Sequence, residues 1–276
     1  MLKRHLRKIR VGVIGCGAIG SRIARSIQKD LRKYCELSGV YDIDEDKSFN
    51  LVKELGIMNR LKTSLRDLIK SCDCVVEAVN AKDTRQIIRE ALKSKKSVLA
   101  MSVGKLLNAH DLFNLAKKNQ CHILLPSGAI AGVDAIKAAS LAPIDRITLT
   151  TRKPPSGFRN NPYFAKKNID ISKINRETVL FDGDVDTAVK LFPQNINVAA
   201  TVSLACQSKS KMRIRIITSP YYTKNSHEIE MSGDFGRMMT RTDNVVCPDN
   251  PKTSYLAVLS GIQTLKQFCT GILIGT

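Results

Sequence analysis

The sequence predicts an α/β protein, with an N-terminal doubly wound parallel sheet followed by a second α+β domain built on a mainly antiparallel sheet. Between residues 10 and 125, short apolar β-branched runs alternate with amphipathic stretches, which is typical of βαβ units. After Pro126, segments of alternating polar and apolar residues replace that pattern. We therefore expect a first domain at residues 1–128, a second at residues 129–250, and a C-terminal helix within residues 251–276 that packs back on the first domain.

The first domain should contain five strands and five helices. The expected strands are Arg10–Ile14, Leu37–Tyr41, Cys74–Val79, Ser97–Ala100 and a buried strand at His122–Leu125. The expected helices are Ile19–Leu31, Lys47–Glu54, Ser64–Lys70, Asp83–Lys93 and Ala109–Lys118, the last capped by Asn108.

The second half of the sequence predicts fewer strands and helices than the first. The expected strands are Ile144–Arg152, Lys211–Thr218 and His227–Ser232, with a turn at Ser232–Gly236. The expected helices are Asp184–Leu191, Asn197–Cys206 and Thr253–Phe268, with Pro251 at the entrance of the last. Residues 153–168, rich in Pro, Asn and Lys, read as a loose loop.

Composition excludes several classes of protein. The formal net charge is +19, but the basic residues are spread along the chain, Trp is absent and aromatic residues make up 5%. A solvated basic surface is therefore expected rather than a specific nucleic-acid site. No apolar run approaches the roughly 20 residues that a membrane span needs, and the basic N-terminus lacks the rest of a signal peptide. Eight scattered cysteines fit a reducing, cytoplasmic location and predict no metal site.

The most informative motif is G-x-G-x-x-G. It consists of Gly15, Cys16, Gly17, Ala18, Ile19 and Gly20, and it follows a strand and opens a helix. Gly15 permits the tight turn, Gly17 admits a pyrophosphate and Gly20 lets helix and strand pack closely. Amides at the helix N-terminus then face the phosphate charge. This context identifies the first domain as a Rossmann domain.

Asp42 ends the next strand and should accept hydrogen bonds from a ribose. Its charge favours NAD over NADP, although nearby Lys47 weakens the exclusion of NADP. Val79 and Asn80 end a later strand at the sheet edge where such cofactors bind, so they are further candidates for the cofactor pocket.

Three further segments carry a more specific signal. They are Leu125–Gly132, Leu191–Ala199 and Asp249–Ser254, and together they resemble the L-aspartate dehydrogenase family from about Val11 to Phe268. The resemblance implies NAD(P)-dependent oxidation of L-aspartate to iminoaspartate, which is then hydrolysed to oxaloacetate and ammonia or enters quinolinate and NAD (pyridine nucleotide) biosynthesis. It also implies a homodimer, cofactor contacts at Ala129 and Asn195, and His227 as the catalytic residue.

The residue type at position 227 suits this chemistry. Conversion of an amine to an imine releases protons, and His is the side chain whose unperturbed pKa of about 6.5 is closest to neutrality. Of the four histidines, His5 lies in the basic tail, His110 opens a surface helix and His122 begins a strand. We expect His227 at a loop-to-strand junction that a substrate can reach.

Other site residues follow from weaker arguments. Asn195 and Asn197 flank a helix start, so an amide there binds the nicotinamide carboxamide or caps the helix. A dicarboxylate substrate needs cations, and Lys153 and Lys252 adjoin family-like segments. The chain departs from the family in its basic N-terminus, its charge and an extra loop at residues 156–169.

Two alternatives remain open. Another amino-acid or semialdehyde dehydrogenase or reductase could use the same scaffold with a cysteine nucleophile, for which Cys121 and Cys206 are the candidates. A nucleotide-sensing Rossmann protein would need neither His227 nor the segment around Asn195.

Overall fold

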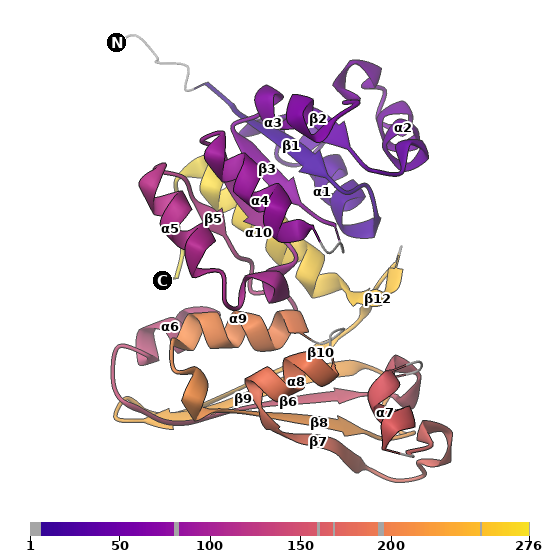
Figure 1. Ribbon diagram of the computed structural model, residues 1–276, viewed down its shortest axis with the longest axis vertical. Helices are drawn as coiled ribbons and strands as arrows, with labels where there is room; N and C mark the ends of the chain where they lie inside the picture. The colour runs from indigo at the N-terminus through magenta and orange to yellow at the C-terminus, as the bar shows by residue number, and fades with distance from the viewer. Residues whose placement is uncertain are drawn as a thin grey trace. The chain divides into compact units, whose positions relative to one another are not determined.

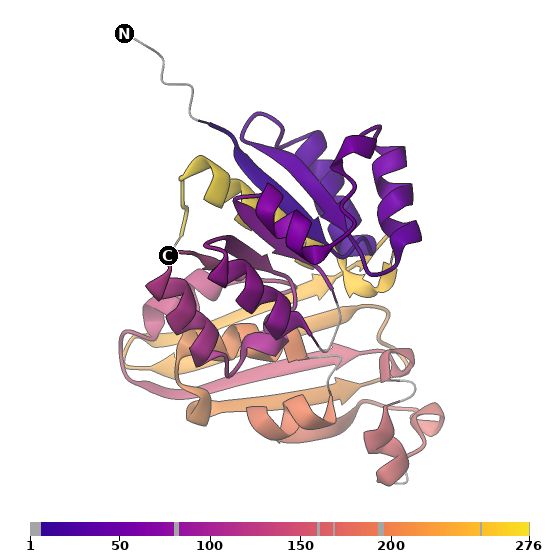
Figure 2. The ribbon, with the colours of Figure 1, turned by 45° about the horizontal axis from the view of Figure 1, so that its top comes forward.

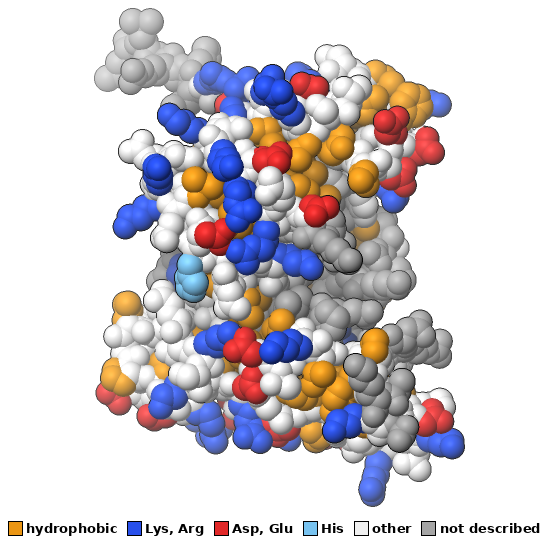
Figure 3. Space-filling view, in the orientation of Figure 1, with side chains coloured by type: hydrophobic (Ala, Val, Ile, Leu, Met, Phe, Trp, Pro, Cys, Tyr) orange, Lys and Arg blue, Asp and Glu red, His pale blue; other side chains and the backbone are white. Residues whose placement is uncertain are grey.

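The computed structural model describes residues 7–79, 83–158, 161–167, 169–192, 196–248 and 250–275. The chain divides into two compact units, one formed by residues 1–126 and 258–274 and the other by residues 127–257 and 275–276. Among the described residues, no helix has the length and apolar character required to cross a membrane. On the face shown in Figure 3, Lys and Arg side chains are scattered among acidic and neutral ones.

The first unit is built on a parallel sheet in the order β2-β1-β3-β4-β5. Its strands are β1 (Ile9–Ile14), β2 (Cys35–Tyr41), β3 (Cys74–Glu77), β4 (Ser97–Ala100) and β5 (Ile123–Leu124). Its helices are α1 (Ala18–Gln28), α2 (Glu45–Glu54), α3 (Leu65–Ser71), α4 (Thr84–Lys93) and α5 (His110–Lys118), arranged around the sheet in Figure 1. The strand order reverses between β1 and β3, so their carboxyl ends form the switch point at which such sheets bind ligands.

The C-terminal helix α10 (Tyr255–Thr270) contributes to the core of the first unit. Leu265 is fully buried in the same apolar cluster as Val11, Ile23 and Met101. The expected helix entrance at Pro251 is wrong, because this residue lies in β12 (Asn250–Ser254), which pairs with β11 (Val246–Cys247). Proline is tolerated on the edge of so small a sheet.

The second unit contains a five-stranded sheet in the order β10-β9-β6-β8-β7. The strands are β6 (Ile144–Lys153), β7 (Thr178–Asp184), β8 (Met212–Thr218), β9 (Asn225–Gly233) and β10 (Gly236–Asn244). Only β6 and β8 pair in parallel, so the predicted fold class is confirmed for both units. Figures 1 and 2 show α8 (Val185–Leu191) and α9 (Ile196–Cys206) over one face of this sheet, with α6 (Val133–Ala139) beside α9.

Several local expectations need correction. Asn108 does not cap α5, because that helix begins one residue later with Ala109 at its N-cap. The segment at residues 153–168 is not a loose loop: its described part contains a 3-10 turn (Pro155–Phe158) and α7 (Pro162–Lys166). Phe158 and Phe192 both stack edge-on against Phe164, which anchors this segment. Further 3-10 turns occur at Met58–Arg60, Val103–Leu106, Ile171–Lys173 and Lys209–Lys211.

Candidate cofactor and catalytic sites

The glycine turn, which is the segment Gly15–Gly20 of the first unit, has the shape that the G-x-G-x-x-G motif requires. Gly15 has a φ of +91°, and a Cβ at this position would lie 2.6 Å from the carbonyl oxygen of Ala78. A Cβ on Gly20 would lie 1.8 Å from the carbonyl oxygen of Gly15. Both positions therefore exclude a side chain, the first by backbone conformation and contact, the second by contact alone.

Gly17 differs from these two glycines, because a Cβ there would meet no described atom within 4 Å. Gly17 is the N-cap of α1 and has no side chain to cap the helix, and Ala18 and Ile19 form the first turn. The amides of that turn lie at the positive end of the helix dipole, next to the exposed Gly17. This exposed cradle fits the pyrophosphate of a dinucleotide.

Asp42 lies directly after β2 and turns toward the glycine turn. Its Oδ2 accepts a hydrogen bond from the Cys16 amide at 2.6 Å, and its Oδ1 accepts one from the Asp44 amide at 2.9 Å. Lys47 pairs with Asp44 at 2.9 Å, and this pair raises the pKa of the lysine. The carboxylate expected to bind the ribose is thus fixed against the turn expected to bind the phosphates.

Val79 lies beside the glycine turn, where its Cγ1 would be 2.8 Å from a Cβ on Gly15. Its amide donates to Oε1 of Glu77 at 3.1 Å, and Ser102 Oγ also lies 2.8 Å from that oxygen. Glu77 is fully buried, and burial raises the pKa of its carboxyl to about 7. Glu77 was not among the site residues predicted from the sequence, although an acid that ends an apolar strand is a visible signal. Asn80 lies outside the described residues.

His227 is not at a loop-to-strand junction. It is the third residue of β9 and is only 5% exposed, so the expected accessible position is wrong. Its Nδ1 lies 3.0 Å from Oγ1 of Thr151 on β6. Burial first, and then the charge of Lys153, lower the pKa of His227 to about 3. The imidazole is therefore neutral at pH 7.

Lys153 follows Thr151 by two residues on β6, so both side chains lie on one face of the sheet. Burial lowers the pKa of Lys153 to about 8. The register of β6 with β9 places Thr151 opposite His227. The sequence thus identified two members of this group, Lys153 and His227, but not the threonine between them.

Ala129 belongs to the same part of the second unit. Its carbonyl oxygen accepts hydrogen bonds from Thr242 Oγ1 at 2.8 Å and Asn244 Nδ2 at 3.0 Å, both on β10. Thr242 is directly opposite His227 in the β9 and β10 pairing. The structure therefore brings together Ala129 and His227, which lie far apart in the sequence.

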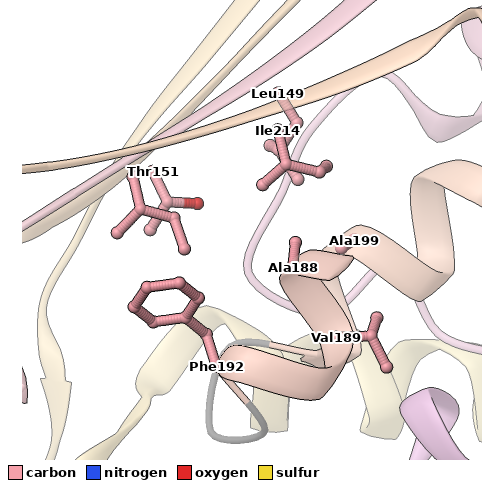
Figure 4. Close-up of a pocket in the computed structure, with 8 residues that line it drawn as sticks. Leu149, Thr151, Ala188, Val189, Phe192, Ala199 and Ile214 are labelled. Atoms are coloured by element: carbon pink, nitrogen blue, oxygen red, sulfur yellow. The ribbon is translucent and has the colours of Figure 1, made fainter. Parts of the chain in front are cut away.

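A small apolar pocket borders this group. Figure 4 shows Thr151 on β6 above the ring of Phe192, with Ala188 and Ala199 contributed by α8 and α9. The remaining lining residues are Leu149, Val189, Ile214 and Ile216. The hydroxyl of Thr151 is thus held between its histidine partner and an apolar wall.

The other candidate residues are less well defined. Asn195 lies outside the described residues, and no side-chain contact of Lys252 is described. Asn197 is exposed and is the second residue of α9, which begins at Ile196, one residue before the expected start. The strand expected to be buried at His122–Leu125 is only partly buried, and His122 before it is exposed and packs against Phe268. Within the described ranges, no cluster of His, Cys, Asp and Glu fits a metal ion.

Comparison with known proteins agrees with the division of the chain into two units. Residues 15–126 match the family model for the NAD-binding domain of homoserine dehydrogenase, and residues 134–268 match the model for the C-terminal domain of aspartate dehydrogenase. The L-aspartate dehydrogenase of Methanosarcina mazei is 43% identical over 271 residues, which cover 97% of this chain and 100% of the relative. That of Methanococcoides burtonii is 41% identical with the same coverage.

Solved structures share the fold at lower identity. The aspartate dehydrogenase of Thermotoga maritima superposes with a TM-score of 0.70 at 22% identity, covering 98% of this chain and 100% of that one. A hyperthermophilic archaeal homoserine dehydrogenase in complex with NADPH gives a TM-score of 0.56 at 13% identity, covering 98% and 99%. The identity and coverage of the methanogen relatives, rather than these superpositions, decide the relationship. The chain belongs to the L-aspartate dehydrogenase family.

Proposed function

We propose that this protein is an NAD(P)-dependent L-aspartate dehydrogenase that converts L-aspartate to iminoaspartate. The observation that carries the proposal is the 43% identity to an L-aspartate dehydrogenase over 97% of the chain. The chain also has residues with the chemistry that such a reaction needs: the glycine turn, Asp42, and the group formed by His227, Thr151 and Lys153. Asn80, Ala129, Asn195 and Asn197 complete the proposed cofactor site.

The proposed role of His227 is to accept a proton from the substrate amine as the imine forms. A neutral imidazole is required for this step, and the low pKa of His227 supplies it at neutral pH. Thr151 would orient the ring through Nδ1, leaving Nε2 for the substrate. A bound nicotinamide would accept the hydrogen and electron pair that leave the substrate Cα.

Lys153 is the proposed partner of a substrate carboxylate. It is close enough to His227 to lower the pKa of the imidazole, so one substrate could contact both side chains. An anion paired with Lys153 would weaken this repulsion and make His227 a better proton acceptor. Lys252 remains a second proposed cation for the dicarboxylate.

The experiment follows reduced cofactor at its absorbance band with L-aspartate and NAD or NADP, and its oxidation with oxaloacetate and ammonia. We expect activity from the intact protein and a loss of at least about 100-fold in kcat for His227→Ala, the scale of a general acid–base group. Unchanged NADH binding by the variant is the control. Inactivity of the intact protein with L-aspartate would refute the substrate, and a fully active variant would refute the role of His227.

We also propose a cytoplasmic homodimer whose product is hydrolysed to oxaloacetate and ammonia or enters quinolinate synthesis. The resemblance to the L-aspartate dehydrogenase family supports self-association, because it implies a homodimer. Sedimentation of the intact protein tests this state.

The cysteine-dependent alternative is the weaker candidate. Burial raises the pKa of the thiols of Cys121 and Cys206, whereas a nucleophilic cysteine needs a lowered pKa. Retention of activity after treatment with a thiol-alkylating reagent would count against a catalytic cysteine.

A further inference from the structure

Glu77 is a buried acid at the carboxyl end of β3 whose role the dehydrogenase reaction does not explain. Its side chain is 0% exposed. Its Oε2 accepts a hydrogen bond from the Ser102 amide at 3.2 Å, and its Oε1 accepts one from the Val79 amide at 3.1 Å. Thr84 on α4 also hydrogen-bonds to this carboxyl. The acid therefore ties together the segments that follow β3 and β4.

The hydroxyl of Ser102 has two acceptors within reach but only one hydrogen. Its Oγ lies 2.8 Å from Oε1 of Glu77 and 2.6 Å from the carbonyl oxygen of Val79. When Glu77 is ionised, the two oxygens compete for that hydrogen. When Glu77 is protonated, its O–H can donate to Ser102 Oγ, and Ser102 can then donate to Val79. One proton thus decides whether the Val79 carbonyl is held.

Val79 in turn forms part of the wall of the glycine turn. Its Cγ1 and the Ala78 carbonyl oxygen lie 2.8 Å and 2.6 Å from the place where a Cβ on Gly15 would be. The Ala78 amide donates to the Ile14 carbonyl at 2.9 Å, which fixes this segment against β1. A shift of Val79 is therefore transmitted to the turn that faces the cofactor phosphates.

We propose that Glu77 is a positioning residue for the dinucleotide, acting through Ser102 and Val79, and that its carboxyl carries a proton when the dinucleotide is bound. This inference rests on the proposed cofactor site but not on the identity of the substrate.

The charge of the dinucleotide also favours a protonated Glu77. Burial raises the pKa of Glu77 to about 7, and the Ser102, Val79 and Thr84 hydrogen bonds oppose that rise. Arg85 and Arg89 of α4 form their ion pairs with Asp111 and not with Glu77. The other charged residues on the elements around Glu77 are Arg10 on β1, Glu90 and Lys93 on α4, Asp83 at its N-cap, and Lys105 in the 3-10 turn after Ser102. A pyrophosphate adds negative charge, which favours the neutral acid.

Cofactor affinity should therefore fall as pH rises through 7. NADH binding to the intact protein, followed by nicotinamide fluorescence from about pH 6 to 8.5, should show a rise in Kd of roughly three- to tenfold, the range set by a coupling of up to one pKa unit. Glu77→Gln carries no titratable proton and should make this profile flat. Glu36→Gln, at an exposed position on β2, is the matched control and should retain the slope.

Carbon-13 NMR of glutamate-labelled protein gives a second readout that needs no activity. The signal removed by Glu77→Gln should titrate near pH 7 in the free protein and at higher pH with NADH. Ser102→Ala removes a hydrogen bond that lowers the pKa, so it should move the free midpoint upward and weaken NADH binding.

A pH-independent Kd in the intact protein, an unchanged slope in Glu77→Gln, or a midpoint that NADH does not raise would each overturn the proposal. These outcomes are separate from the test of substrate. NADH binding with the expected slope but no oxidation of L-aspartate would support this inference and refute the proposed reaction. Normal oxidation of L-aspartate with a flat pH profile of NADH binding would support the proposed reaction and refute the role of Glu77. Absence of NADH and NADPH binding would refute the proposed reaction and the role of Glu77 together.

Discussion

Thr151 and His227 face each other across β6 and β9, with the hydroxyl oxygen of one 3.0 Å from Nδ1 of the other. Both side chains are buried, at 3% and 5% exposure. A buried imidazole needs a partner for each ring nitrogen that water no longer reaches. Thr151 supplies one at Nδ1, which leaves the reactivity of the ring to Nε2.

Replacing Thr151 by valine tests this relationship, because the two side chains have similar shape but valine has no hydroxyl. We expect Thr151→Val to lower kcat by about tenfold through loss of ring orientation, with little change in the KM for L-aspartate. Thr151→Ser keeps the hydroxyl and should restore most of the rate. Steady-state kinetics of both variants distinguish this from a packing role, which would impair the serine variant, because it lacks the methyl group, more than the valine variant.

Lys153 should control substrate affinity in a pH-dependent way. Burial lowers its pKa to about 8, so the cation that binds a carboxylate is present below pH 8 and is lost above it. We expect the KM for L-aspartate to rise above that pH, by up to about tenfold per unit. Lys153→Arg should move this rise beyond pH 10, and Lys153→Met should raise KM by roughly 30-fold at pH 7 through loss of an ion pair.

A matching rise of KM with pH in Lys153→Arg would exclude the lysine as its source. NADH binding by Lys153→Met should stay unchanged, because the proposed role concerns the substrate alone.

His227 should also affect the pH dependence of stability. Its pKa is about 3 when folded and about 6.5 when unfolded, so the unfolded chain binds more protons between these values and stability falls as pH drops below 6.5. From pH 7 to pH 5 this cost is about 2 kcal/mol. Glu77 acts in the opposite direction, since its folded pKa is raised and its contribution is lost as pH rises through 7.

The comparison with a variant isolates the histidine. His227→Gln should gain roughly 2 kcal/mol relative to the unchanged protein between pH 7 and pH 5, measured by urea unfolding. An identical pH dependence in the two proteins would show that His227 is protonated at pH 5 in the folded chain.

The sequence predicted the parts of this protein whose signals are local. The glycine turn and the strands β1 to β4 follow from apolar runs and from residues adjacent in the chain. β7 and β10 were not predicted, because β10 is mostly polar and charged apart from two methionines, and β7 ends in Asp-Gly-Asp. Pairing with neighbouring strands overrides such weak local preference.

The same distinction applies to the sites. His227 and Ala129 were identified by resemblance, but Thr151, Thr242 and Asn244 lie beside them only through strand register and hydrogen bonds over many residues. The pKa of His227 depends on burial by several elements, so no local pattern could give it. The unperturbed pKa of about 6.5 therefore did not predict the pKa in the folded chain.

Asp42 should set the choice between NAD and NADP. Its carboxylate excludes a 2′-phosphate by charge, while its Oδ2 also holds the Cys16 amide. Asp42→Asn removes the charge and keeps an oxygen for that amide, so we expect NADPH affinity to improve by about tenfold and NADH affinity to weaken by a similar factor. Fluorescence titrations with both cofactors measure this, and an unchanged ratio would remove Asp42 from the specificity site.

Gly17 and Gly20 should respond to the same substitution in opposite ways. An added methyl group at Gly20 would overlap the Gly15 carbonyl at 1.8 Å, so Gly20→Ala should lower stability by at least about 2 kcal/mol and reduce the Tm by several degrees. At Gly17 the methyl group meets no described atom, so Gly17→Ala should leave the Tm within about 2 °C. It should nevertheless weaken NADH binding by at least about tenfold, because the methyl group would occupy the space proposed for the pyrophosphate. Thermal unfolding and NADH titration of the two variants therefore separate glycine required for folding from glycine required for binding; full NADH affinity in Gly17→Ala would place the phosphates elsewhere.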